Sequence, residues 1–327
     1  DHNNMEVVLV DGASTDNTRA LMCEFALDNK DEFRRVVVLD NPKKTLPSGW
    51  NVALREYKGD AIIKVDAHAV IPEDFVSKNV RVLETGEYIC GGQRPNIIDK
   101  PTPFKETLLL AESSMFGSSI ASYRNNPGKT YVKSLFHAAY RREVFEKVGF
   151  FNEELVRTED NEIHYRMRKA GYKLCFDPDI ISYQYTRSSL KAMLKQKYAN
   201  GYWIGKTSKV CPKCLSIYHF VPFAFVSAII ASGSVIGATG LAECIKKRHN
   251  HTLGKGISAL RKVTVVLTTV MWVLYALMAS GMAAVSAFKA EDKRNITNAC
   301  LPVLFLLLHL SYGIGTIAGL MDKSKRG

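Results

Sequence analysis

The sequence predicts an α/β domain followed by helices that enter a membrane. Two observations predict the α/β part: apolar runs of strand length alternate with helix-length segments, and polar residues stand where the runs end. A third observation predicts the membrane part. Residues 216–241, 263–288 and 299–321 are apolar over about the 20 residues that a helix needs to cross a bilayer.

The first third of the chain has the order strand, helix, strand, helix, strand. Residues 5–10 form an apolar run rich in β-branched residues, and an amphipathic helix continues from there to about residue 29. Residues 36–39 predict the second strand, residues 48–57 the second helix and residues 61–65 the third strand. This spacing indicates a doubly wound sheet, whose ligands bind beyond the carboxyl ends of the strands.

Two of these strand ends carry residues suited to chemistry. Asp66 directly follows the third strand, and His68 lies two positions later on the same side of an extended segment. A carboxylate oxygen and an imidazole nitrogen suit Mn²⁺, and diphosphate oxygens would complete its shell, so the expected cofactor is a divalent cation, Mn²⁺ or Mg²⁺. Asp11 follows the first strand and has two interpretations: it accepts the imino hydrogen of a nucleobase, or it caps its own turn with Ser14 and Thr15.

An acidic pair, Glu159 and Asp160, follows Thr158 at the start of a later helix that Gly171 closes. The pair either stabilises the helix start, where the helix dipole favours ionised carboxylates, or supplies Asp160 as a general base for an acceptor hydroxyl. The dipole and a nearby metal both lower the pKa of a carboxylate and weaken it as a base. Enforced proximity to the acceptor would compensate.

Basic residues cluster beside the apolar segments. The net charge is +12, and six lysines approach the first apolar segment; they are Lys191, Lys195, Lys197, Lys206, Lys209 and Lys213. Such clusters are typical of contact with anionic headgroups and of cytoplasmic retention, so membrane lipids are the expected partners. A nucleic-acid partner is not expected, because it would need a basic patch with interleaved aromatics on the α/β domain. The lone C-x-x-C at Cys211 and Cys214 lacks the second pair of ligands that a zinc site needs.

The ordered series of these segments resembles the inverting family 2 glycosyltransferases of the GT-A fold. It is most similar to the membrane-attached bacterial type that serves succinoglycan and other exopolysaccharide biosynthesis. The matching stretches lie within residues 5–206; they are residues 10–18, residues 66–68 as a variant of the family's D-x-D, residues 136–145 and residues 158–160.

The resemblance implies a role for each candidate residue. Asp11 would contact the uracil of a UDP-sugar, Asp66 and His68 would serve the metal and the diphosphate, and Asp160, beside Glu159, would be the base. It also implies a glycosyltransferase domain at residues 1–187, an amphipathic interface helix at 188–213 and a membrane domain at 214–327. The family's first strand and helix have no counterpart here, so the natural N terminus is expected to be missing.

The expected activity is transfer of a sugar from a nucleotide-sugar donor to a lipid-linked acceptor at the bacterial plasma membrane. The protein would cross this membrane several times and keep its catalytic domain in the cytoplasm. One alternative is a processive polysaccharide synthase, although the Q-x-x-R-W motif of such enzymes is absent and Gln196 and Trp203 have the wrong spacing. Another is a non-catalytic subunit of an export complex.

The topology has two interpretations. Three crossings would place residues 242–262, with six basic residues, outside the cell, against the positive-inside rule. Alternatively, Pro222 and three glycines make the first apolar segment re-entrant, and the other two form a hairpin. The sequence slightly favours this second version.

Overall fold

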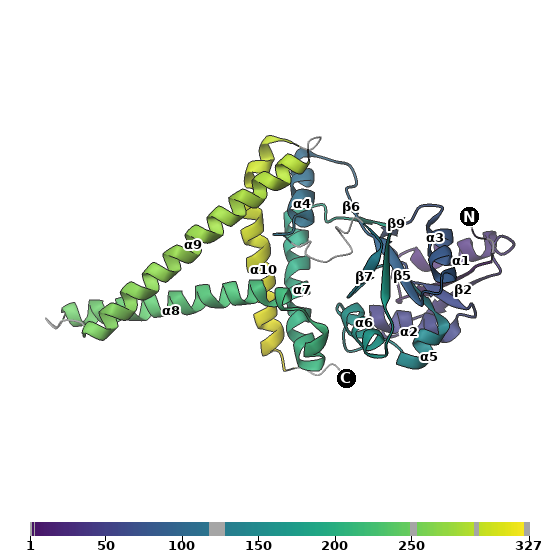
Figure 1. Ribbon diagram of the computed structural model, residues 1–327, viewed down its shortest axis with the longest axis horizontal. Coiled ribbons are helices and arrows are strands. Elements are labelled where there is room, and N and C mark those ends of the chain that lie inside the picture. Colours follow the sequence, from purple (N-terminus) through teal and green to yellow (C-terminus); the bar gives the residue numbers. More distant parts are fainter. Residues whose placement is uncertain (1, 3, 118–127, 249–253, 291–293, 324–327) are drawn as a thin grey trace.

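The computed structural model describes residue 2 and residues 4–117, 128–248, 254–290 and 294–323. Figure 1 shows an α/β domain joined to a set of long helices. Within the described residues, three helices are long and apolar enough to cross a membrane. The predicted fold class, an α/β domain followed by apolar helices, is therefore confirmed.

The described strands pair in three sheets. A parallel pair consists of β1 (Glu6–Asp11) and β2 (Arg35–Asp40). A five-stranded mixed sheet has the order β3-β8-β5-β9-β7. Its strands are β3 (Ala61–Ile63), β5 (Ile89–Gln93), β7 (Thr130–Val132), β8 (Ala138–Arg141) and β9 (Leu174–Ile181). The third sheet contains β4 (Ala69–Val70), β6 (Asn96–Ile97) and β10 (Tyr183–Tyr185).

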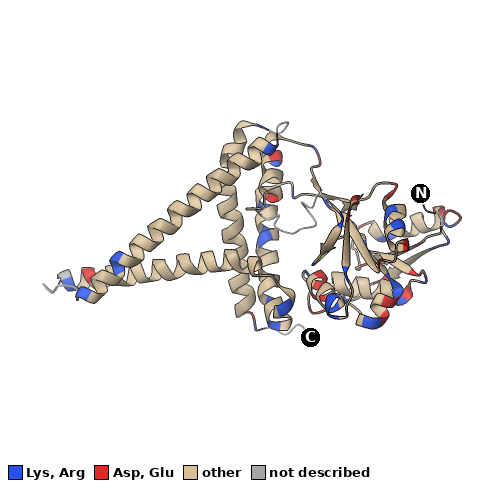
Figure 2. Ribbon diagram, in the orientation of Figure 1, with Lys and Arg blue, Asp and Glu red and all other residues tan. Residues whose placement is uncertain are grey.

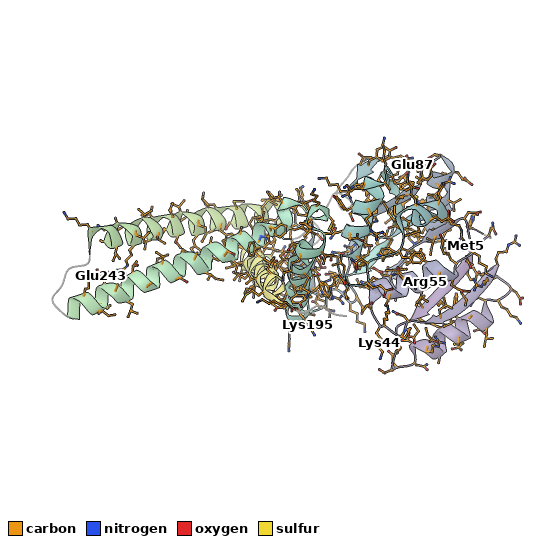
Figure 3. The ribbon with its side chains drawn as sticks, turned by 90° about the horizontal axis from the view of Figure 1, so that it is seen from below. Met5, Lys44, Arg55, Glu87, Lys195 and Glu243 are labelled. Carbon is orange, nitrogen blue, oxygen red and sulfur yellow. The ribbon has the colours of Figure 1, made fainter. Side chains whose placement is uncertain are left out.

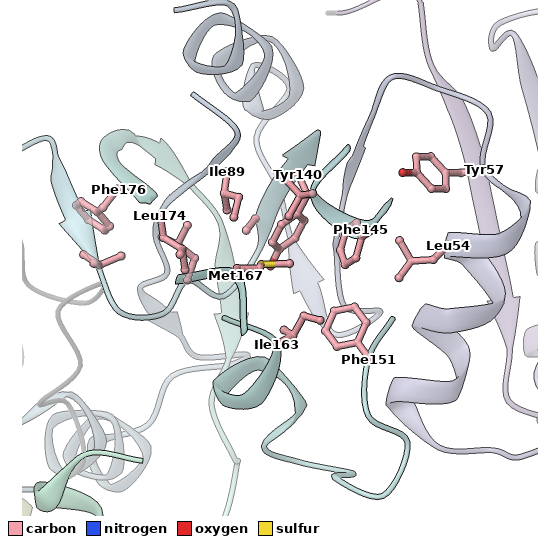
Figure 4. Packing of buried hydrophobic residues seen from close by; sticks show 14 residues of the cluster. Leu54, Tyr57, Ile89, Tyr140, Phe145, Phe151, Ile163, Met167, Leu174 and Phe176 are labelled. Carbon is pink, nitrogen blue, oxygen red and sulfur yellow. The ribbon is translucent and has the colours of Figure 1, made fainter. Parts of the chain in front are cut away.

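Helices pack on both faces of the five-stranded sheet. Because side chains alternate along a strand, Tyr140 of β8 points into one core while Ala139 points into another. The larger core joins the sheet to α2 (Leu46–Glu56), α5 (Arg142–Val148) and α6 (Glu159–Lys169), as Figure 4 shows around Tyr140. The smaller core packs against α3 (Phe75–Glu84). The remaining helix of this part is α1 (Thr18–Asp28), which packs beside β2.

The helix α7 (Leu190–Val210) runs alongside the apolar helix α10 (Leu301–Met321). A Cβ added at Gly201 or Gly205 of α7, or at Gly315 or Gly319 of α10, would lie within 3.0 Å of the backbone of the other helix. Small residues at such positions allow two helix backbones to approach closely. The predicted interface helix, α7, thus packs one face against α10. The helix α4 (Pro103–Ser113) joins the same apolar core.

The helices α8 (Val221–Arg248) and α9 (Lys255–Lys289) form a hairpin that points away from the α/β domain (Figure 1). Figure 2 shows charged residues near its tip and few along its length, and Figure 3 labels Glu243 at that tip, where it pairs with Arg261. The helix α8 is continuous through the glycines that suggested a re-entrant segment. Of the predicted basic loop 242–262, residues 249–253 lie outside the described residues.

Candidate active site

A cavity of about 1240 Å³ lies between the α/β domain and the C-terminal helices. Asp66, His68, Glu159 and Asp160 all line it, although more than 90 positions separate the two pairs in the sequence. The opposite wall comes from α7, from α10 and from the turn before α8. Four of the five predicted site residues are therefore brought together.

Lys64, which the sequence analysis did not identify, binds the acidic pair. It is 4% exposed, and its Nζ lies 2.6 Å from Oδ1 of Asp160 and 3.8 Å from Oε1 of Glu159. The ammonium also lies 5.0 Å from the ring centre of Trp50 and 5.7 Å from that of Phe151. Burial acts to lower the pKa of Lys64, but the neighbouring carboxylates outweigh it and raise the pKa above its usual value. A charged lysine therefore holds Asp160 in place.

Burial is the largest influence on the pKa values of Glu159 and Asp160. Burial, together with the charge of Asp160, raises the pKa of Glu159 to about 8, although Lys64 opposes this. One oxygen of Glu159, Oε2, has no hydrogen-bond partner in the described part of the chain. Burial also raises the pKa of Asp160, although Lys64 opposes this. The weakening of the base that the sequence suggested is thus offset, and the Asp160 carboxylate binds Lys64 rather than capping its helix.

The two carboxylate oxygens of Asp66 have different surroundings. Its Oδ2 lies 3.7 Å from Nε2 of His137, and its buried Oδ1 lacks a partner among the described groups. The other ring nitrogen of His137 shares a 2.8 Å hydrogen bond with Ser182. Burial acts to raise the pKa of Asp66, but His137 and Lys64 outweigh it and lower the pKa, so this carboxylate is ionised at neutral pH.

His68 and Asp66 fit a divalent cation whose remaining ligands come from a substrate. Burial lowers the pKa of His68, which keeps its imidazole in the neutral form that binds metals. Its Nε2 contacts the side chain of Gln184, a contact that a metal would replace. Among the described residues, no group of three or more histidine, cysteine or acidic side chains is placed to hold an ion. A cation held by Asp66, His68 and a substrate diphosphate therefore stays a prediction.

Asp11 does not line the cavity. It is 4% exposed at the end of β1, where its carboxylate accepts hydrogen bonds from the hydroxyl of Ser14 at 2.6 Å and from the Ser14 amide at 3.2 Å. This is the turn-capping arrangement that the sequence allowed. Contact with a nucleobase stays a prediction.

The helix α7 contributes side chains that the sequence analysis assigned to the lipid surface. Lys197 is 5% exposed, and its Nζ lies 3.1 Å from Oε1 of Glu112 on α4. The hydroxyl of Thr186 donates to the same carboxylate at 2.6 Å. The expectation that Lys197 faces lipid headgroups is therefore wrong, because its side chain is buried against Glu112. The sequence could not show this contact, since the two residues lie 85 positions apart. Gln196 and Asn200 also line the cavity.

Residues 1–149 match a model of the family described as "Glycosyl transferase family 2". This part of the chain is therefore similar to family 2 glycosyltransferases. The matched region includes Asp66, His68 and Lys64 and ends before Glu159 and Asp160.

Several glycosyltransferases and biosynthetic proteins are similar to this chain. The succinoglycan biosynthesis protein ExoA of Rhizobium meliloti (strain 1021) is 30% identical over 203 residues, which are 61% of this chain and 59% of that protein. A dolichyl N-acetyl-α-D-glucosaminyl phosphate 3-β-D-2,3-diacetamido-2,3-dideoxy-β-D-glucuronosyltransferase of Methanococcus voltae is 25% identical over 70% of this chain and 71% of that protein. The chain thus spans less than two thirds of the first relative's length.

The crystal structure of S. aureus TarS 1–349 in complex with UDP is a distant structural neighbour. It has 18% sequence identity and a TM-score of 0.38, and the match covers 61% of this chain and 56% of that one. This likeness is too distant to carry an argument. The family match and the sequence relatives support a glycosyltransferase of polysaccharide biosynthesis.

Proposed function

We propose that this glycosyltransferase moves a sugar, with inversion, from a nucleotide-sugar donor, expected to be a UDP-sugar, to a lipid-linked acceptor. One observation carries the proposal. Asp66, in the D-x-D-like segment, and Asp160, the candidate base, line a single cavity whose far wall includes the apolar helix α10. A donor bound at Asp66 and an acceptor anchored in a membrane would meet there.

In the proposed mechanism, each residue has a separate task. Asp160 accepts the proton of the acceptor hydroxyl as its oxygen attacks the anomeric carbon, and Lys64 fixes the orientation of that carboxylate. Asp66 and His68 would hold the divalent cation, which supplies positive charge for the departing nucleoside diphosphate. These four residues line one cavity, so the donor and the acceptor would be held there together.

The far wall supports a lipid-linked acceptor. Leu308 and Tyr312 of α10, with Ile217 just before α8 and Pro222 at its start, form its apolar or aromatic part, beside polar side chains of α7. Such a surface suits a hydrocarbon chain, whereas a free sugar in water would gain little from it. The name of one relative, a transferase acting on a dolichyl-linked sugar phosphate, agrees with this assignment.

A nucleotide-sugar panel tests the function. Membranes that contain the full chain are incubated with radiolabelled nucleotide sugars and a polyprenyl-linked saccharide, and the lipid-extractable label is analysed. We expect one donor to extend the acceptor by a single sugar. A long polymer would instead support the processive synthase, and no incorporation with any donor would contradict the proposal.

Metal dependence is tested in the same assay. Because Asp66 would supply the only carboxylate ligand, we expect Asp66→Ala and an excess of chelator each to abolish transfer, with Mn²⁺ or Mg²⁺ restoring activity to the chelated wild type alone. Asp74→Ala, at an exposed helix start, is the matched control. Full activity in excess chelator would refute the metal assignment.

A further inference from the structure

Two arginines of the cavity have no task in the mechanism above. Arg157 lies three positions before Asp160, and Arg187 follows β10; both line the cavity. Arg157 donates one hydrogen bond, from Nη1 to Oδ1 of Asn200 on α7, at 3.3 Å. Within the described residues, neither guanidinium forms an ion pair with a carboxylate.

The two guanidinium groups lie close enough to repel each other. Burial lowers the pKa of Arg157, and the positive charge of Arg187 lowers it further. Both side chains line the same cavity as Asp66 and Asp160. The charge of Glu159 acts in the opposite direction, but neither arginine forms an ion pair in the described part of the chain. Two such guanidinium groups favour an anion between them, and the planar guanidinium binds phosphate through two parallel hydrogen bonds.

The surroundings indicate which phosphate this is. Asn200 and Gln196 belong to α7, and the Oε1 atom of Gln196 is buried without a partner in the described part of the chain. Beyond them lie Leu308 and Tyr312 of α10. An amphiphile with its phosphate at the arginines would place its hydrocarbon chain on this apolar wall and a sugar hydroxyl near Gln196.

We infer that Arg157 and Arg187 bind the phosphate that links the acceptor sugar to its lipid chain. This inference rests on the proposed lipid-linked acceptor and assigns its anion-binding subsite. The diphosphate of the donor has the same chemistry and is the other source of such an anion. Arg157 donates its hydrogen bond to α7, the helix that packs on the apolar helix α10, and this favours the acceptor.

Direct binding to the full chain in detergent micelles tests the inference without requiring turnover. The probes are polyprenyl phosphate, the uncharged polyprenol and UDP, and the variants are Arg157→Gln and Arg187→Gln. Arg81→Gln, on the outer surface of α3, is the matched control. Each cavity variant is expected to bind polyprenyl phosphate about 10-fold more weakly, as for the loss of one charge-assisted hydrogen bond. Affinity for UDP and polyprenol should change less than about twofold.

The outcomes distinguish the acceptor phosphate from the donor diphosphate. Weaker binding of UDP with unchanged binding of polyprenyl phosphate would assign the arginines to the donor and overturn the inference. Unchanged binding of both probes, or no binding of polyprenyl phosphate by the wild type, would also overturn it. Arginine-dependent binding without any sugar transfer would leave the phosphate site standing and refute the proposed function. Partial recovery in Arg157→Lys, with a monodisperse gel-filtration profile for every variant, excludes a folding defect.

Discussion

At the scale of single residues, the site combines groups whose electrostatic effects oppose one another. Lys64 offsets the negative charge of Asp160, while burial raises the pKa of both members of the acidic pair. Asp66, in contrast, is ionised because His137 and Lys64 are close to it. These differences between three carboxylates match a division of labour in which one carboxylate binds a cation and another accepts a proton.

Glu159 is expected to make the protein less stable as the pH rises. Its pKa is about 8 in the folded state, against an ordinary value of 4.5. Between these values the folded chain binds the extra proton, so stability falls with rising pH through this window. Glu159→Gln cannot ionise, so we expect it to lack this loss of stability. The Tm of the variant relative to that of the wild type should therefore be higher at about pH 8 than at about pH 5.

Thermal unfolding in detergent at both pH values measures this effect. The exposed Glu154→Gln serves as the control, because its side chain lies on the surface. A difference in Tm between Glu159→Gln and the wild type that is the same at both pH values would contradict the account.

The sequence predicted four of the residues that line the cavity but not Lys64, which binds the acidic pair. Asp66, His68, Glu159 and Asp160 stand at recognisable positions, a strand end and a helix start. Lys64 could not be identified, because a lysine within an apolar strand carries no sign of a partner 96 positions away. Arg157 and Arg187 were also missed, because nothing in the sequence around either residue indicates that both line the cavity.

At the scale of elements, the packing of α7 on α10 brings the membrane helices to the active site. The helix α7 carries Gln196 and Asn200 into the cavity, while its glycines lie against those of α10. The sequence predicted α7 closely, but as a helix on the membrane surface. The two small-x-x-x-small patterns, at Gly201 with Gly205 and at Gly315 with Gly319, were the available signal for its packing.

Substitution of one of these glycines should separate the two helices. A Cβ at Gly319 would meet the backbone of Tyr202, so we expect Gly319→Ala to cost about 1–3 kcal/mol or more in stability and to impair transfer. Gly281→Ala is the matched control, because nothing lies within 4 Å of its Cβ position on α9. It should be neutral or stabilising, since alanine favours helices over glycine by about 1 kcal/mol. Equal melting temperatures for the two variants would refute the packing argument.

At the scale of the whole molecule, the three apolar helices pack on one another. The sequence slightly favoured a hairpin of the last two segments, with the first one re-entrant. In the structure α8 and α9 pack on each other and both also pack on α10, while Thr297, just before α10, contacts Thr107 and Asp322, just after it, contacts α7. Which of the segments cross a membrane stays a prediction. Lengths and hydropathy predicted the three helices, but their pairing depends on contacts that no local pattern encodes.

The α8–α9 hairpin is expected to cross the membrane. The 28 residues of α8 span about 42 Å, more than the hydrocarbon core of about 30 Å. Cys244 is exposed near the tip, and Cys23 is exposed on the α/β domain. In variants that keep only one of these cysteines, a membrane-impermeant thiol reagent added to intact cells should label Cys244 and not Cys23. Protection of Cys244 until the cells are opened would contradict this topology and support the cytoplasmic loop that the positive-inside rule favours.

The central claim is that Asp160 is the base of a sugar transfer, and the initial rate of transfer by Asp160→Asn tests it most directly. The rate is measured with the donor and acceptor that support wild-type activity, and donor affinity is determined in the same preparation. We expect the rate to fall about 10²–10⁴-fold, as for loss of a positioned base, with donor affinity and fold preserved. A variant that loses thermal stability but transfers sugar at the wild-type rate would contradict the account.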